Sequence, residues 1–166
     1  MTRNEVLKPK IEICLRAKEW SVFWPKSAQN VRAILYHALK YFPFFTGKIS
    51  VSVLLTDDAE IKELNCKYRH KDKPTNVLSF PACKEFSNNA EEYFLGDIAL
   101  ALETTVKEAQ EKAISLEKHA AHLLIHGLLH LLGYDHKKNA EAERMEALEA
   151  LILQDYLSKN KVESAI

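Results

Sequence analysis

The segment HGLLHLLGYDH, residues 126–136, constrains the fold of this chain more strongly than any other stretch. It holds three histidines, His126, His130 and His136, with a glycine at position 133. Residues four apart lie on one face of an α-helix, so the first two imidazoles can point to a common place. Glycine readily adopts positive φ at a helix end, and the chain can then turn back with the third histidine. The spacing therefore predicts a helix that ends near Gly133 and a turn that brings three imidazoles together.

The three imidazoles have the number and type of a catalytic metal site. Three neutral histidines leave the fourth tetrahedral position of zinc open to water, which is typical of catalytic and not of structural zinc. We therefore predict that His126, His130 and His136 bind one Zn²⁺ ion. Nickel, copper and iron also accept all-histidine ligand sets and remain alternatives. A half-buried helix position would explain any one of these histidines, but three at this spacing favour a metal.

Three neighbouring polar residues have more than one interpretation. His122 lies one turn before His126 on the same helix face, and we predict that it contacts substrate. Support of the metal ligands and simple burial on the helix are the alternatives for His122. We expect His119 on the surface. Asp135 could orient a ligand imidazole or could cap the turn before His136.

Position 127 distinguishes this segment from a group of zinc peptidases. The ligand spacing resembles the H-E-x-x-H-x-x-G-x-x-H motif of metzincins, but Gly127 replaces their glutamate. That glutamate takes a proton from water as the water attacks a peptide carbonyl, which glycine cannot do. A metal-dependent hydrolase of peptides or amides, with a base from elsewhere, remains an alternative. Phosphodiester cleavage is favoured, because a metal and a nearby cation can stabilise charge on the phosphorus centre.

A basic cluster on the N-terminal side of the histidines supplies cations for such chemistry. It contains Arg69 together with Lys67, His70, Lys71 and Lys73. A guanidinium offers a planar fork of N–H donors that matches two phosphate oxygens. The cluster could instead be a solvated charged loop. We predict that Arg69 is catalytic, on the condition that this loop reaches the histidines.

The hydrophobic pattern predicts strands in the first part of the chain and helices in the second. Alternating or continuous apolar residues predict strands around 11–15, 49–55, 77–80 and 95–102. Helical periodicity predicts helices around 25–41, 57–68, 103–112, 115–132 and 140–158. Asp57 and Glu60 form a capping-box pattern at the start of the second helix. We therefore predict a single domain over residues 1–166 with an α+β fold, in which a small mixed sheet of about four strands packs with helices around a central metal-bearing helix.

Composition limits the location and the partners of the chain. Its 23 basic and 23 acidic side chains give a net charge of zero, so a nucleic-acid partner would need a local basic patch. The three cysteines are widely spaced, which predicts free thiols in a reducing compartment. No stretch reaches the ~20 apolar residues of a membrane span, and the first residues lack the apolar core of a signal peptide. We expect a soluble, cytoplasmic protein.

Four segments of the chain carry a family pattern. They are Leu64-Asn65-x-x-Tyr68-Arg69, Lys73-Pro74-Thr75-Asn76-Val77-Leu78-Ser79-Phe80-Pro81, Leu95-Gly96-Asp97-Ile98 and the histidine segment from His122 to His136. Together they resemble the YbeY endoribonuclease family, whose members are bacterial and organellar rRNA maturation factors. The resemblance extends over roughly residues 49–157, and the histidine segment is highly specific to the family.

The resemblance implies an α+β metalloprotein in which His126, His130 and His136 hold zinc. It implies a single-strand-specific endoribonuclease that acts in 16S rRNA 3′-end processing and ribosome quality control. Its partners would be rRNA and the ribosome or a ribosomal protein, without DNA or a membrane. Arg69 matches the arginine that acts near the metal on the RNA.

The chain departs from the family pattern at one position, and the resemblance leaves the nucleophile open. Asn76 lies where many family members have aspartate, so a carboxylate at this position is not needed for metal binding. The nucleophile could be water or a ribose 2′-hydroxyl. A non-catalytic ribosome-assembly factor, whose metal only stabilises the fold, is a further alternative.

Overall fold

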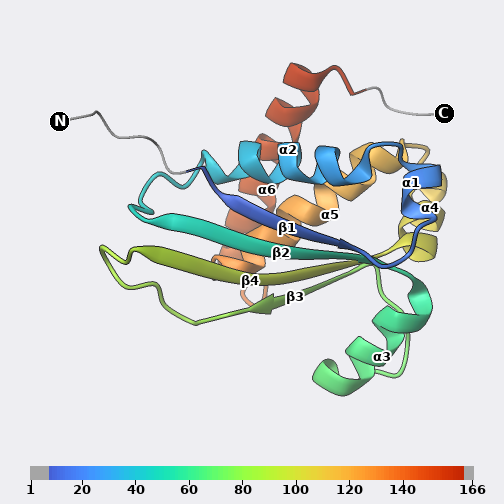
Figure 1. The fold of residues 1–166 in the computed structure, drawn as a ribbon, viewed down its shortest axis with the longest axis horizontal. Helices are drawn as coiled ribbons and strands as arrows, with labels where there is room; N and C mark the ends of the chain where they lie inside the picture. Colours follow the sequence, from blue (N-terminus) through green and yellow to red (C-terminus); the bar gives the residue numbers. More distant parts are fainter. Residues whose placement is uncertain (1–7, 163–166) are drawn as a thin grey trace.

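The computed structural model describes residues 8–162. Within this range the strands are β1 (Lys10–Leu15), β2 (Lys48–Thr56), β3 (Val77–Pro81) and β4 (Glu92–Ala101). They form one sheet in the order β1-β2-β4-β3, in which β1, β2 and β4 are parallel and β3 is antiparallel to β4 (Figure 1). This mixed sheet of four strands, together with the helices, confirms the predicted α+β fold class.

Six helices accompany the sheet in the described range. They are α1 (Trp20–Phe23), α2 (Ser27–Leu39), α3 (Asp58–Arg69), α4 (Leu102–Glu111), α5 (Leu116–Leu131) and α6 (Asn139–Asn160). Figure 1 shows α2 and α5 on one side of the sheet and α3 on the other. Successive side chains of a strand point to opposite faces, and β2 follows this rule. Val53 lies in the large core that α2 and α5 share, whereas Leu54 packs in a smaller cluster with Ile61 of α3.

The predicted elements are present, with shifts at their ends. β4 begins at Glu92 instead of Leu95. The hydrophobic pattern does not indicate α1, because a helix of 4 residues is too short to show a period. Asp57 caps α3 as expected, since its Oδ1 accepts the backbone N–H of Glu60 at 2.9 Å. The Glu60 carboxylate accepts a hydrogen bond from the Thr56 hydroxyl at 2.7 Å, in place of the reciprocal contact of a capping box.

Helix α5 lies at the centre of the helical layer. It contacts β3 and β4 of the sheet and also α2, α4 and α6. Its buried side chains include Ala121, Leu124 and Leu128, all of which are fully inaccessible to solvent. This position agrees with the central helix that the sequence predicts.

Gly127 lies where α5 packs against the sheet. A Cβ atom at this position would lie 3.1 Å from both the Ser79 hydroxyl oxygen and the Ile98 Cγ2 atom. Such distances are shorter than ordinary van der Waals contact. The Ser79 hydroxyl also donates a hydrogen bond to the Gly127 carbonyl at 3.2 Å. The glycine therefore permits the close approach of helix and sheet, and a glutamate at position 127 would point into this interface.

The state of the cysteines and the length of the apolar helices were both predicted from composition. Cys14, Cys66 and Cys83 are exposed and free, which confirms the prediction of free thiols. Among the helices between residues 8 and 162, none is long and apolar enough to cross a membrane.

Replacing Gly127 with alanine tests the packing role of this glycine. Alanine favours a helix by about 1 kcal/mol over glycine, but overpacking a well-filled interface costs about 1–3 kcal/mol. We expect Gly127→Ala to lower the free energy of unfolding by about 1 kcal/mol, measured by urea denaturation of metal-free protein. In a Ser79→Ala background, where the hydroxyl is absent, the loss should be smaller. A gain in stability from Gly127→Ala in the otherwise unchanged chain would contradict the packing role.

Candidate metal centre

The end of α5 brings the three predicted metal ligands together. His126 and His130 lie on successive turns of the helix, and their Nε2 atoms are 3.1 Å apart. His136 follows in the loop after the helix. One ligand atom from each of these histidines lies within 4.8 Å of the other two. The three imidazoles are therefore close enough to share one metal ion.

The turn after α5 depends on Gly133. This glycine has a φ of +97°, so the predicted positive φ is confirmed. Its N–H donates to the His130 carbonyl at 3.1 Å, and the Tyr134 N–H donates to the Leu129 carbonyl at 3.0 Å. This pair of hydrogen bonds is the Schellman motif, which ends a helix and reverses the chain. The reversal returns His136 to the end of α5.

Hydrogen bonds at Nδ1 orient two of the imidazoles. His126 Nδ1 lies 2.8 Å from a carboxylate oxygen of Glu149, and His130 Nδ1 lies 3.0 Å from the Tyr134 carbonyl. Both partners can only accept, so each Nδ1 carries the proton and each Nε2 presents a lone pair. Zinc–nitrogen bonds of about 2.0–2.1 Å in a tetrahedron place ligand atoms about 3.3–3.4 Å apart. The observed separation of the two Nε2 atoms, 3.1 Å, is close to this value, so the residues fit a shared metal ion.

The protonation states also suit a metal. Burial lowers the pKa of His130, and the neighbouring His126 and His136 lower it further. A lowered pKa keeps the imidazole neutral, which is the form that binds metal. Burial alone would raise the pKa of Glu149, but hydrogen bonds from His122 and His126 outweigh burial and lower this pKa to about 2. Glu149 is therefore an ionised acceptor.

Glu149 is a site residue that the sequence motifs did not indicate. It is 6% exposed, and its carboxylate contacts the imidazoles of both His122 and His126. The buried residues of α6 are Met145, Glu149, Ile152 and Tyr156, which share one face of the helix. Acidic residues are almost never fully buried unless they are paired. A carboxylate inside an otherwise apolar helical stripe is thus the signal that could have revealed this residue.

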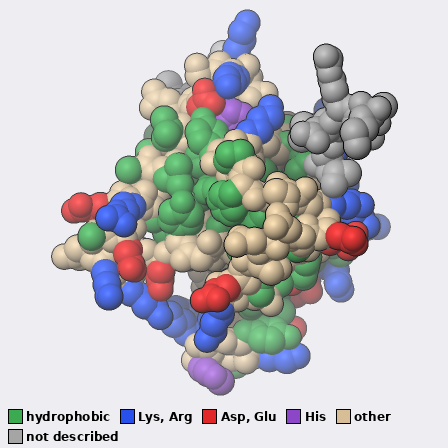
Figure 2. All heavy atoms as spheres, turned by 90° about the vertical axis from the view of Figure 1, so that its left-hand side faces the viewer, with side chains coloured by type: hydrophobic (Ala, Val, Ile, Leu, Met, Phe, Trp, Pro, Cys, Tyr) green, Lys and Arg blue, Asp and Glu red, His purple; other side chains and the backbone are tan. Residues whose placement is uncertain are grey.

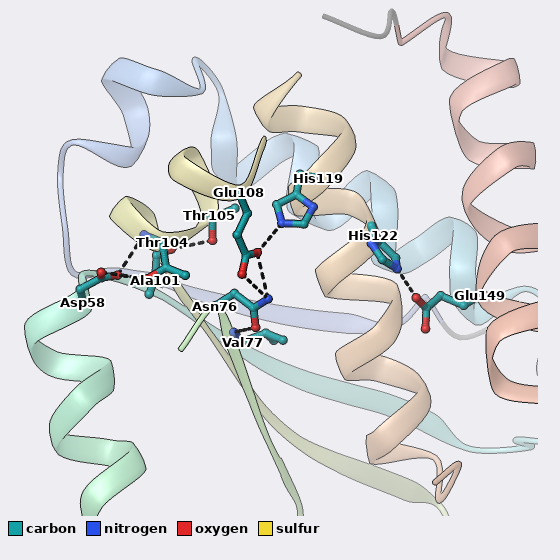
Figure 3. A network of polar contacts seen from close by, with 10 residues as sticks. All are labelled: Asp58, Asn76, Val77, Ala101, Thr104, Thr105, Glu108, His119, His122 and Glu149. Atoms are coloured by element: carbon teal, nitrogen blue, oxygen red, sulfur yellow. Dashed lines mark hydrogen bonds and ion pairs between the residues drawn. The ribbon is translucent and has the colours of Figure 1, made fainter. Parts of the chain in front are cut away.

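His119 is buried, so the expectation of a surface position is wrong. Its side chain is 1% exposed, because α4 folds back against α5 and covers this turn of the helix. Its Nε2 atom lies 2.6 Å from Glu108 of α4. Glu108 also accepts hydrogen bonds from the Asn76 amide at 3.0 and 3.1 Å (Figure 3). These contacts join α4, α5 and the segment that leads into β3.

An open cleft of about 660 Å³ contains the three histidines of the candidate metal site. Arg69, Lys71 and Lys73 of the predicted basic cluster line the same cleft. Lys67 instead lies over the ring of Tyr68, at 5.1 Å from the ring centre. The structure thus brings part of the basic cluster to the histidines, and the predicted role of Arg69 depends on this proximity.

Ser79 of β3 connects Arg69 to the metal-site helix. The Arg69 Nη2 atom donates a hydrogen bond to the Ser79 carbonyl at 2.6 Å, and its guanidinium lies 5.5 Å from the centre of the Phe80 ring. The Ser79 hydroxyl donates in turn to Gly127 of α5. β3 is an edge strand, so it has backbone groups that are free of strand pairing and can bond a side chain. Ser79 therefore contacts both the Arg69 guanidinium and α5, and couples the position of the guanidinium to that of the helix.

In the structure His122 lies at a second cleft, and Asp135 lies in the turn before His136. A second cleft, of about 620 Å³, is lined by His122 and shares His126 and His136 with the first cleft. The His122 side chain is 35% exposed, and its Nε2 atom contacts Glu149 (Figure 3). Asp135 caps the turn, because its Oδ1 accepts the backbone N–H of His136 at 2.7 Å.

Comparisons with known proteins give a family match and several similar proteins. The sequence model of a family described as Endoribonuclease YbeY matches residues 12–157. Proteins named endoribonuclease YbeY from Wolbachia pipientis and Rhodopseudomonas palustris are each 43% identical to the chain, over 143 and 155 residues. These alignments cover 86% and 92% of the chain and 91% and 90% of the relatives.

One further relative is matched over a shorter stretch, and one solved structure is less similar in sequence. A protein of the same name from Rhizobium etli is 54% identical over 111 residues, which is 67% of the chain and 65% of that relative. The chain thus spans slightly less than two thirds of the Rhizobium protein. The solution structure of TM1509 from Thermotoga maritima is 27% identical, covers 91% of both chains and has a TM-score of 0.61.

Replacing Asn76 with aspartate tests the contact with Glu108. Hydrogen bonds from Asn76 and His119 overcome the effect of burial and lower the pKa of Glu108. A group with a lowered pKa stabilises the fold above its ordinary pKa and loses this effect as pH falls through the folded value. An aspartate at position 76 would place a second carboxylate beside Glu108. Repulsion between the two charges would then replace the stabilising hydrogen bonds from the Asn76 amide. We expect Asn76→Asp to lower the free energy of unfolding by about 1–3 kcal/mol near about pH 8.

The pH dependence separates this effect from a general loss of packing. One of the two carboxyl groups would take up a proton on acidification, so the destabilisation by Asn76→Asp should be smaller near about pH 5. Urea denaturation of metal-free protein at both pH values measures the difference. Asn30→Asp is the control, because the Asn30 amide bonds only a backbone carbonyl, that of Pro25. An equal effect of Asn76→Asp at both pH values would contradict the charge argument.

Proposed function

This chain belongs to the endoribonuclease YbeY family, and we propose that it is a zinc-dependent endoribonuclease that cleaves single-stranded RNA. The observation that carries the proposal is the meeting of His126, His130 and His136 with Arg69 in one open cleft. An open cleft can admit a flexible single strand of RNA, whose bases are not paired. We further propose that residues 1–166 act as one domain.

The three histidines would hold the zinc ion through ring nitrogens. A zinc ion at this position supplies a Lewis acid that polarises the phosphodiester and lowers the pKa of water. Glu149 and the Tyr134 carbonyl keep the His126 and His130 rings oriented through their Nδ1 atoms. The His126 and His130 rings are therefore held in place before RNA binds.

Arg69 would contact the phosphate at which the strand is cleaved. Only its Nη2 atom is bonded to the Ser79 carbonyl, so other N–H donors of the fork can face phosphate oxygens. The guanidinium would stabilise negative charge as it develops in the transition state. Lys71 and Lys73 line the same cleft and would bind neighbouring phosphates.

His122 would contact the RNA from the second cleft. That cleft meets the basic cleft at His126 and His136, so a strand that crosses the metal site passes close to it. The second cleft also contains the carboxylates of Glu108, Glu111 and Glu146, which repel phosphate. The phosphates would therefore follow the basic cleft.

We propose rRNA as the biological substrate, with a role in 16S rRNA 3′-end processing and ribosome quality control. Family membership is the support for this role. The formal net charge of zero predicts weak nonspecific binding of RNA, so a ribosomal protein or the ribosome would help to deliver the substrate. The cytoplasm is the proposed location.

Cleavage of a labelled single-stranded RNA tests the catalytic assignments. We expect removal of the metal by a chelator, or His126→Ala, to abolish cleavage, and Arg69→Ala to lower its rate by about 10²–10³-fold. Zinc should restore the chelated protein but not His126→Ala. Arg16→Ala, which changes an exposed arginine that does not line either cleft, should cleave like the unmodified chain. A cyclic 2′,3′-phosphate at the product end would identify the ribose 2′-hydroxyl as nucleophile.

Equal cleavage by all of these proteins would show that a contaminating nuclease is responsible and would exclude the proposal. Normal cleavage by Arg69→Ala alone would exclude the role of Arg69 and leave the metal assignment intact. Turnover of peptides in place of RNA would favour a metal-dependent peptide hydrolase.

Salt dependence of binding tests the path of the phosphates. Each lysine that neutralises a phosphate of a single strand contributes about 0.7 to the slope of log affinity against log salt concentration. We expect Lys71→Ala and Lys73→Ala each to reduce the slope by about 0.7, measured by fluorescence anisotropy with metal-free protein. Lys18→Ala, which changes an exposed lysine that does not line either cleft, should leave the slope unchanged. A similar reduction by Lys18→Ala would mean that RNA does not follow the basic cleft.

A further inference from the structure

We propose that Glu149 is a positioning residue, which holds His126 in the tautomer and orientation required for metal binding and anchors His122 beside the same site. This inference rests on the metal site of the proposed function but not on RNA cleavage. Glu149 would not bind the metal itself, since it faces the opposite side of the His126 ring, at Nδ1.

The geometry around Glu149 places one carboxylate between two imidazoles. One oxygen lies 2.8 Å from His126 Nδ1, and the other contacts His122 Nε2. These two histidines are one turn apart on α5, whereas Glu149 comes from α6, which packs across α5. Figure 3 shows the His122 ring pointing from α5 toward Glu149 on α6. Both oxygens of the carboxylate are thus used at the candidate metal centre.

A buried carboxylate requires an explanation, because taking an ion out of water costs several kcal/mol. Glu149 is 6% exposed and shares its helix face with Met145, Ile152 and Tyr156. An apolar side chain of similar size would complete this stripe without the cost of burying a charge. Buried ion pairs can often be replaced by apolar residues without loss of stability. The position of the carboxylate is therefore better explained by its effect on the histidines than by stability.

The effect on His126 follows from the chemistry of imidazole. Neutral imidazole carries one proton, and an acceptor at Nδ1 keeps that proton there and leaves the lone pair at Nε2. The Nε2 atom is the one that faces His130, at 3.1 Å. A carboxylate acceptor also makes the ring a stronger donor to a metal. His130 receives the corresponding support from the Tyr134 carbonyl.

His122 restrains Glu149 from the other side. Its contact with the second oxygen limits rotation of the carboxylate. The His122 side chain is nevertheless 35% exposed and lines the second cleft. Substitution of His122 should therefore weaken metal binding less than substitution of Glu149, because the contact between Glu149 and His126 is kept.

Metal affinity of Glu149 variants provides the first test. Zinc affinity is measured by competition with a chromogenic chelator, without RNA. Loss of a carboxylate that supports a ligand histidine lowers metal affinity by about 10–100-fold, which we expect for Glu149→Met. Glu149→Gln should lose less, since its amide oxygen can still accept from His126. Metal-free Glu149→Met should be less stable than the unmodified chain, because His122 and His126 lose their shared acceptor, so its fold is checked before the zinc titration.

Asp155 offers a matched control on the same helix. Its carboxylate lies 3.1 Å from His37 Nε2 and accepts from the Tyr41 hydroxyl at 2.7 Å, so it also pairs a histidine of another helix with α6. Asp155→Leu should leave zinc affinity unchanged, whatever its effect on stability. If Asp155→Leu weakened zinc binding as much as Glu149→Met, the contact between the helices and not the contact with His126 would be responsible.

The tautomer of His126 provides a second test, which compares the unmodified chain with Glu149→Met. Nitrogen-15 NMR of the imidazoles in metal-free, unmodified protein distinguishes a proton on Nδ1 from a proton on Nε2. We expect the proton of His126 on Nδ1, and a mixture of both tautomers in Glu149→Met. A proton on Nε2 in the unmodified chain, or an unchanged zinc affinity in folded Glu149→Met, would overturn the proposal. Failure of RNA cleavage would leave both measurements valid.

Discussion

The close contact between α5 and the sheet at Gly127 is the constraint on which the arrangement of the site depends. The contact brings the Ser79 hydroxyl of β3 against the helix, where it bonds the Gly127 carbonyl. The backbone carbonyl of Ser79 accepts from Arg69. Neighbouring strands and helices have many ways to pack, but a larger residue at 127 would move α5 away from β3. The distance between the guanidinium and the histidines is therefore coupled to a glycine that carries no chemistry itself.

The end of α5 determines the rest of the candidate metal centre. The Schellman turn at Gly133 satisfies carbonyl groups at the helix end and also directs His136 back to the helix. The same turn places the Tyr134 carbonyl at His130 Nδ1. The turn that ends α5 thus also positions the third candidate ligand, His136, because the reversed chain must pass close to the last turn of the helix.

Buried polar groups around α5 follow one pattern. Glu149 of α6 and Glu108 of α4 each contact an imidazole of α5, so both buried carboxylates have a hydrogen-bond partner. Figure 3 shows these two carboxylates on either side of the helix. Figure 2 shows a different face of the molecule, on which hydrophobic side chains gather beside Lys, Arg, Asp and Glu. Charged groups are therefore exposed at the surface or paired with a partner inside the helical layer.

Local sequence patterns predicted many of these features correctly. Alternating or continuous apolar residues identified four strands, Asp57 identified the start of α3, and Gly133 identified the end of α5. These features depend on interactions within a few residues, which sequence spacing reports directly. His119 was expected on the surface because its neighbours in sequence do not reveal that α4 covers it.

The sequence by itself determined that three imidazoles meet, because helix periodicity and one glycine turn are local properties. Only the tertiary structure decided which groups complete the centre. Glu149 is separated from His126 by 23 positions, and Asn76 is separated from Glu108 by 32. Contacts of this kind depend on how whole helices and strands pack, and no periodicity within a single element specifies them. One short segment of the sequence therefore predicts the metal ligands, whereas the groups that orient these imidazoles and carry charge beside them are selected by the fold.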